Sequence, residues 1–97
     1  MLSKIPFDLS SIDEEDLEKQ LLRIAIMAEL DAINLYEQLA SLAEDERLKA
    51  LFYEIAREEK THVGEFMTLL LEKDEEQVEE LEAGKSEVEE LFEEEEE

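Results

Sequence analysis

The sequence predicts an all-α fold: an antiparallel two-helix hairpin, followed by a short C-terminal helix, that dimerises to complete a four-helix bundle. Two observations support the hairpin. Apolar residues recur in steps of three and four along two long segments, which is the spacing of one face of an α-helix. A short polar stretch at residues 44–47 joins the segments, and neither contains a proline. A connection this short makes the two helices antiparallel neighbours.

The hairpin is expected to occupy residues 11–73, after an extended N-terminal arm at residues 1–10 that contains Pro6. Ser11 followed by Glu14 matches a capping box, so the first helix is predicted to start there and to run to about residue 43.

The second helix is expected from about Arg47 to Lys73. Gly64 lies inside it and costs roughly 1 kcal/mol relative to alanine. It marks either a close approach of another helix beside the site described below or a tolerated glycine.

The chain becomes strongly acidic after residue 73. Val78 and Leu81 begin a faint helical periodicity, so residues 74–92 are expected to form a short acidic helix in which Gly84 is a break. Residues 93–97 are all glutamate, and mutual repulsion predicts a disordered tail or linker there.

The first helix carries a second apolar row beside the one that faces its partner helix. The row comprises Leu17, Leu21, Ile24, Ala28, Leu35, Leu39 and Leu42. A two-helix hairpin covers only one apolar face per helix, so the second row predicts an oligomer.

Residues that bind metals interrupt the inward apolar row of each helix. The row of the first helix is Leu22, Ile26, Glu29, Ile33, Tyr36 and Ala40. The row of the second is Leu48, Phe52, Ile55, Glu59, His62, Phe66 and Leu69. A buried carboxylate without a partner costs on the order of several kcal/mol, so these polar residues predict a shared metal ion.

The three polar residues are expected to form one cluster. In a hairpin that turns near Asp45 and Glu46, residues whose numbers add up to about 91 lie at the same height along the helices. Glu29 and His62 meet this condition, and Glu59 lies one turn away. Carboxylates and an imidazole suit iron, manganese or zinc, and the absence of cysteine argues against sulfur-rich zinc or iron–sulfur sites.

The residues around the cluster leave alternatives open. Tyr36 follows Glu29 by two helical turns and is either an ordinary core aromatic or a hydrogen-bond partner of a metal-binding carboxylate. Asp31, Glu58 and Glu65 lie off the inward rows and are expected to be solvated charges. An alternative role for Asp31 and Glu65 is to guide metal to the site.

The formal net charge of −22 excludes nucleic acids and anionic membranes as partners and favours cations. No apolar run approaches the length needed to cross a membrane, and the first residues are too short and polar for a signal peptide. We therefore expect a soluble, cytoplasmic protein.

Ferritin-like di-iron bundles take one Glu from each of two helices and a Glu-x-x-His pair from each of two others. This chain supplies one helix of each kind, which is half of such a site. Two copies related by a twofold axis would present Glu29, Glu59 and His62 twice, around two metal ions. The ligand set and the second apolar row therefore predict the same homodimer.

The stretches AELDAINLYEQLA and EIAREEKTHVGEF resemble the encapsulated ferritins, the two-helix ferritin-like proteins of encapsulin nanocompartments. The resemblance covers about residues 10–90. It implies a ferroxidase centre at a dimer interface, with Glu29, Glu59 and His62 as iron ligands and Tyr36 near the metal. It also implies a ring of five dimers, a decamer, inside an encapsulin shell that receives the oxidised iron.

The resemblance predicts oxidation of Fe(II) to Fe(III) by dioxygen at a di-iron centre bridging two subunits, for iron storage. Because the chain ends in glutamates, we expect a ferritin-like domain fused ahead of an encapsulin shell protein. Two alternatives remain open: a rubrerythrin-like peroxide-scavenging di-iron protein, and a structural acidic helical oligomer without catalysis.

Overall fold

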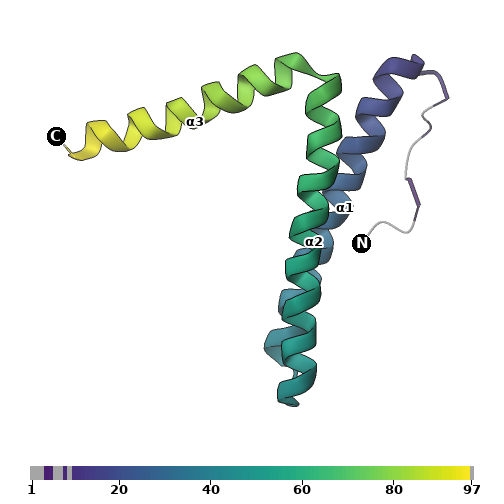
Figure 1. Ribbon diagram of the computed structural model, residues 1–97, viewed down its shortest axis with the longest axis vertical. Coiled ribbons are helices and arrows are strands. Elements are labelled where there is room, and N and C mark those ends of the chain that lie inside the picture. Colours follow the sequence, from purple (N-terminus) through teal and green to yellow (C-terminus); the bar gives the residue numbers. More distant parts are fainter. Residues whose placement is uncertain (1–3, 6–7, 9, 97) are drawn as a thin grey trace.

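The described residues fold into three helices, which confirms the all-α prediction. A computed structural model describes residues 4–5, 8 and 10–96, without the side chains of residues 94–96. The helices are α1 (Glu14–Leu42), α2 (Glu46–Lys73) and α3 (Glu75–Glu96). Figure 1 shows α1 and α2 side by side and antiparallel, with α3 leaving the end of α2 at a steep angle. The predicted arm at residues 1–10 lies largely outside the described residues.

Helix α1 begins three residues after the predicted start. Asp13 is its N-cap residue and makes no side-chain capping hydrogen bond, so the capping box expected at Ser11 is not formed. The first turn carries Glu14, Glu15 and Asp16. These negative charges favour the helix start because they lie at the positive end of the helix dipole.

The hairpin turn occupies residues 43–45 and is held from both sides. The backbone N–H of Ala43 donates to the carbonyl of Leu39 at 3.1 Å and closes α1. The carboxylate of Asp45 accepts hydrogen bonds from the backbone N–H of Arg47 at 2.8 Å and of Leu48 at 3.3 Å, which caps α2. This turn fixes the register of the two helices.

The core of the hairpin is thin. Its buried residues are Ile26, Ala32, Ile33, Ala40, Ala56 and Leu70. Tyr36 and Phe52 add an aromatic contact across the helices, with ring centroids 6.1 Å apart. Leu48 and Leu69, predicted to face inward, are exposed instead, because two helices alone cannot cover a stripe this wide.

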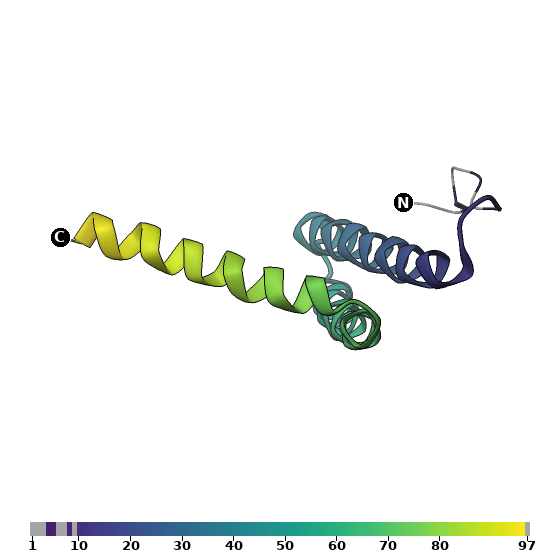
Figure 2. The same cartoon turned by 90° about the horizontal axis from the view of Figure 1, so that it is seen from above.

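Helix α3 is longer than the sequence predicted. It continues through Gly84 and through the glutamate run to Glu96, where a break and a disordered tail at residues 93–97 were expected; Glu97 itself lies outside the described residues. A glycine costs a helix only about 1 kcal/mol, and glutamate is a good helix former, so the local sequence supports a continuous helix. Among the described residues, α3 packs only against α2, and it projects away from the hairpin (Figure 2).

Among the described residues, lysine and arginine form ion pairs that bridge separate parts of the fold. They are Lys73–Glu18 at 2.7 Å, Arg23–Asp74 at 2.9 Å and Lys60–Glu37 at 3.4 Å. Gly64 has open space where a Cβ would lie, so no helix described here approaches it closely. Within the described part of the chain, no helix is long and apolar enough to cross a membrane.

Candidate metal centre

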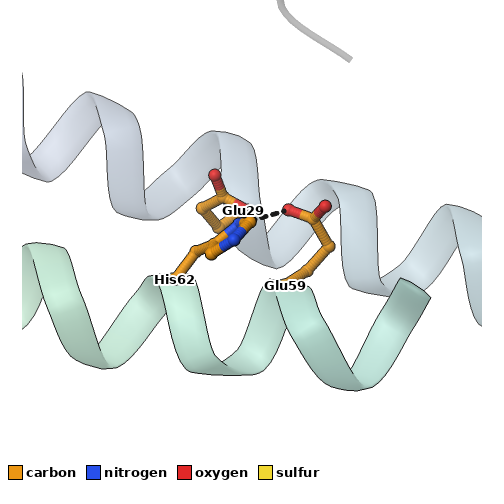
Figure 3. A group of neighbouring side chains, drawn as sticks. All are labelled: Glu29, Glu59 and His62. Carbon is orange, nitrogen blue, oxygen red and sulfur yellow. Dashed lines mark hydrogen bonds and ion pairs between the residues drawn. The ribbon is translucent and has the colours of Figure 1, made fainter. Parts of the chain in front are cut away.

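The three residues that interrupt the apolar rows meet between the helices. Glu29 projects from the middle of α1, and Glu59 and His62 project from adjacent turns of α2 (Figure 3). Each offers a ligand atom, and these atoms all lie within 4.8 Å of one another. The predicted proximity is confirmed, because the turn at residues 43–45 sets the register expected from the sequence.

The imidazole stands between the two carboxylates. His62 Nδ1 lies 3.4 Å from Glu29 Oε2 and 3.4 Å from Glu59 Oε2. This separation is long for a nitrogen–oxygen hydrogen bond, which is about 2.9 Å. A separation of this size suits two ligand atoms that bind the same metal ion at about 2.1 Å each. The donor set, one nitrogen and carboxylate oxygens on rigid helices, fits iron or manganese better than a sulfur-seeking metal.

The charges of the site are uncompensated by basic residues. Among the described residues, Glu29 and Glu59 both pair with His62, and neither forms an ion pair with lysine or arginine. Two nearby carboxylates that are largely withdrawn from water repel each other. A bound cation would relieve this repulsion, so the carboxylates favour metal binding.

The site is open on one side. The side chains of Glu29 and Glu59 are 19% and 18% exposed, whereas that of His62 is 43% exposed. Leu51 and Leu69 lie at helical spacing from His62, eleven residues before it and seven after it, and both are about half exposed. We call the side of the hairpin marked by Leu51, His62 and Leu69 the site face. Its exposed leucines and open histidine offer a surface that a second copy can cover.

One chain supplies too few donors for two metal ions. The ferritin-like arrangement uses four carboxylates and two histidines, and the cluster here holds two carboxylates and one histidine. The geometry is therefore that of half a site.

The structure separates the other candidate residues from the cluster. The ring of Tyr36 packs on Phe52, and within the described part of the chain its hydroxyl forms no hydrogen bond with Glu29 or Glu59. Asp31 is exposed and lies outside the cluster. Glu58 and Glu65 are exposed as well. A role for Tyr36 beside the metal and for Asp31 in metal access remains a prediction.

Two contacts between the helices were not predicted from the sequence. The numbers of Tyr36 and Phe52 also add up to about 91, the sum that places two residues at the same height along the helices, so their contact could have been predicted. The ion pair between Arg23 and Asp74 could not, because it depends on the direction in which the chain leaves α2.

A helical hairpin with a Glu on one helix and Glu-x-x-His on the other is half of a ferritin-like bundle. The sequence model of the rubrerythrin family matches residues 20–97. The structure is similar to the crystal structure of the encapsulated ferritin domain from Pyrococcus furiosus, with a TM-score of 0.83 and 50% identity, covering 94% of this chain and 95% of that one. The chain belongs to the rubrerythrin family and, within it, to the encapsulated ferritins.

A longer relative carries a second domain. The ferritin-like-encapsulin shell fusion protein of Pyrococcus furiosus is 61% identical over 72 residues, which are 74% of this chain and 21% of that protein. The matched region of this chain thus spans about a fifth of the relative's length.

Proposed function

We propose that two copies of this chain pair through their site faces and form a ferroxidase centre that oxidises Fe(II) to Fe(III) with dioxygen. The observation that carries the proposal is the meeting of Glu29, Glu59 and His62 at an open face of the hairpin. Pairing about a twofold axis doubles this set to four carboxylates and two imidazoles. That number matches the ferritin-like di-iron site.

Each residue contributes a defined property to the binding of the substrate ions. The carboxylates of Glu29 and Glu59 are hard, anionic ligands that favour Fe(III) over Fe(II) and so lower the barrier to oxidation. The neutral nitrogen of His62 helps to hold Fe(II) before the reaction. Iron supplies one electron per ion when it is bound. Helix α2 keeps Glu59 and His62 one turn apart and thereby fixes their separation.

We further propose that the site works next to an encapsulin shell. The support is the relative of 61% identity, whose name describes a ferritin-like domain fused to an encapsulin shell protein. In this proposal the chain is the ferritin-like domain ahead of the shell, dimers assemble into a ring, and Fe(III) passes to the enclosed space for storage.

A peroxide-scavenging reaction is the second candidate, because the matching family is rubrerythrin. The same three residues would hold the iron, and peroxide would replace dioxygen as oxidant. A structural helical oligomer without catalysis is the third candidate.

Oxygen uptake after addition of Fe(II) distinguishes the three candidates. We expect rapid dioxygen consumption that stops when the added Fe(II) is spent. Faster iron oxidation by peroxide under anaerobic conditions, with slow dioxygen uptake, would favour the scavenging reaction. Uptake no faster than that of Fe(II) in buffer would leave only the structural role. The matched control is Glu58→Ala, an exposed neighbour of Glu59 that lies outside the cluster.

A further inference from the structure

The imidazole of His62 turns only one of its two ring nitrogens toward the metal cluster. Nδ1 lies 3.4 Å from Glu29 Oε2 and 3.4 Å from Glu59 Oε2, so this nitrogen faces the carboxylates between the helices (Figure 3). The two nitrogens of an imidazole point in directions that are more than a right angle apart. Nε2 therefore points away from these carboxylates, and it has no hydrogen-bond partner among the described residues.

A histidine that binds a metal needs a partner for its outer nitrogen. Such a histidine almost always donates its other ring N–H to a carboxylate, a carbonyl or a water molecule. This hydrogen bond keeps the proton on the outer nitrogen, leaves the lone pair of the inner nitrogen free for the metal and fixes the orientation of the ring. A centre that binds metal through Nδ1 of His62 is therefore expected to hold an acceptor beside Nε2.

Helix α2 places two glutamates on opposite sides of His62. Residues three apart on an α-helix are neighbours, and each step of three positions falls about 60° short of a full turn. Glu59, three residues before His62, therefore lies to one side of it, and Glu65, three residues after it, lies to the other. Glu59 is on the inner side, where its side chain is only 18% exposed. Glu65 is exposed and lies on the outer side, toward which Nε2 points.

The direction of helical side chains favours a contact between Glu65 and His62. A long side chain on a helix leans toward the N-terminus and covers the turn before its own Cα. Glu65 can therefore reach back to His62, as His62 reaches back to Glu59 at the same spacing. Among the described residues, the Glu65 carboxylate has no hydrogen-bond or ion-pair partner that holds it elsewhere. The hydrogen bond to Nε2 is not formed in this structure, and rotation of the exposed Glu65 side chain would form it.

Glu58 is the other carboxylate on the outer side of His62, four residues before it. Its side chain leans away from the imidazole by the same rule. It also interacts with the guanidinium of Arg57, because the pKa of Arg57 is raised by Glu54 and, to a smaller extent, by Glu58. Glu65 is therefore the better acceptor for Nε2.

We propose, on the basis of the ferroxidase function proposed above, that Glu65 is a positioning residue whose carboxylate accepts a hydrogen bond from Nε2–H of His62. The carboxylate keeps the ring proton on Nε2 and holds the ring so that the lone pair of Nδ1 faces Glu29 and Glu59. The same hydrogen bond makes Nδ1 a more basic ligand. Glu65 acts through His62 and does not itself touch the metal.

NMR of the zinc-loaded chain tests the contact directly. His62 is the only histidine of the chain, so every imidazole signal of protein labelled with ¹⁵N-histidine belongs to it. Zinc binds imidazole nitrogen and carboxylate oxygen, and it is redox-silent and diamagnetic. We expect an Nδ1 signal shifted by zinc and an Nε2-bound proton that exchanges slowly with water. Glu65→Ala should speed this exchange by about tenfold or more, because the charge-assisted hydrogen bond is lost.

Three variants separate positioning from charge. Glu65→Ala removes both the charge and the acceptor, whereas Glu65→Gln removes the charge and keeps an oxygen acceptor. Glu58→Ala is the matched control, since it removes one charge from the same side of α2. Zinc affinity, measured by calorimetry, should fall by about tenfold to a hundredfold in Glu65→Ala. It should recover in large part in Glu65→Gln and stay near the unmodified value in Glu58→Ala.

Several outcomes would overturn the positioning role. Equal losses of zinc affinity in Glu65→Gln and Glu65→Ala would show that Glu65 only attracts the metal by its charge. Unchanged exchange of the Nε2 proton in Glu65→Ala, a larger effect in Glu58→Ala, or zinc bound without Nδ1 would each refute it. The ferroxidase proposal fails differently: an unmodified chain that binds zinc through Nδ1 of His62, but takes up no dioxygen with Fe(II), would refute ferroxidase activity and leave the role of Glu65 intact.

Discussion

The guanidinium Nη2 of Arg23 lies 2.9 Å from Oδ2 of Asp74 and joins the first turns of α1 to the residue at which α2 ends and α3 begins. The same carboxylate accepts a hydrogen bond through Oδ1 from the backbone N–H of Gln77 at 3.1 Å and so caps α3. The hydrogen bond from Gln77 and, after it, the contact with Arg23 lower the pKa of Asp74 below its ordinary value of 3.8.

This lowered pKa predicts a defined acid dependence. A group whose pKa is depressed on folding stabilises the fold above its unfolded pKa, and this stabilisation is lost as the pH falls through the folded pKa. Asp74→Asn should therefore be less stable than the unmodified chain at pH 7, and the difference should vanish below the lowered pKa. Denaturant unfolding of both chains at a series of pH values measures the difference, in which the titration of the many other carboxylates cancels.

Arg23→Gln separates the two contacts of Asp74. It removes the ion pair and leaves the negative charge of Asp74 at the start of α3, whereas asparagine loses both the ion pair and this charge, so we expect a smaller loss of stability than in Asp74→Asn. An equal acid dependence in Asp74→Asn and in the unmodified chain would show that Asp74 does not have a depressed pKa.

The sequence was sufficient to predict the hairpin and the meeting of its polar residues. Both follow from a helical period and a short turn, which are local properties of the chain. Residue numbers alone placed Glu29 opposite His62, because two antiparallel helices joined by a tight turn have a single register.

The direction and length of α3 could not be predicted in the same way. One residue, Asp74, separates α2 from α3, and it forms an ion pair with a residue 51 positions away, a contact that the local sequence does not reveal. The helix also continues through Gly84, because the small cost of one glycine is outweighed by its neighbours. The exposure of Leu69 depends on how much of the apolar stripe one partner helix can cover, and this information is not local.

Removal of a cluster residue is expected to abolish rapid iron oxidation. Glu59→Ala or His62→Ala strips two ligands from a site built by two copies, and the oxidation rate should fall by about a hundredfold or more. Helix content should remain high, and the metal-free Glu59→Ala chain should be more stable because one of two repelling carboxylates is gone. Stopped-flow absorbance and thermal unfolding measure the two effects. Oxidation at the unmodified rate in both variants would refute the assigned site.

Loss of the Tyr36 hydroxyl is expected to have a milder effect. Tyr36→Phe keeps the ring contact with Phe52, so unfolding should be unchanged. If the hydroxyl orients a metal-binding carboxylate in the dimer, the rate should fall by about tenfold or less. An unchanged rate would identify Tyr36 as a purely structural aromatic residue.

The half-site predicts the iron content. Tightly bound iron should saturate near one ion per chain, because two chains share two ions, and metal should tighten the dimer because its binding energy is added to the interface. Native mass spectrometry with and without Fe(II) tests both expectations. A monomer carrying two ions would exclude the shared site.

Replacement of Gly84 should stabilise α3. Gly84 has open space where a Cβ would lie, so alanine adds helix propensity worth about 1 kcal/mol without a clash within the chain. Amide hydrogen exchange along α3 should slow in Gly84→Ala. Gly64→Ala, also in open space, is the control and should leave exchange in α3 unchanged.

The opening of the cluster onto the site face means that a defective chain harms its partner as well as itself. In the dimer proposed above, every site contains residues of both chains, so an inactive copy such as His62→Ala disables the site of each dimer that it enters. In an equal mixture of intact and inactive chains that pair at random, only about a quarter of the dimers hold a complete site. If the proposed ferroxidase function holds, the inactive form would therefore be genetically dominant: a cell expressing both forms would lose most of the iron oxidation, although half of its chains were intact.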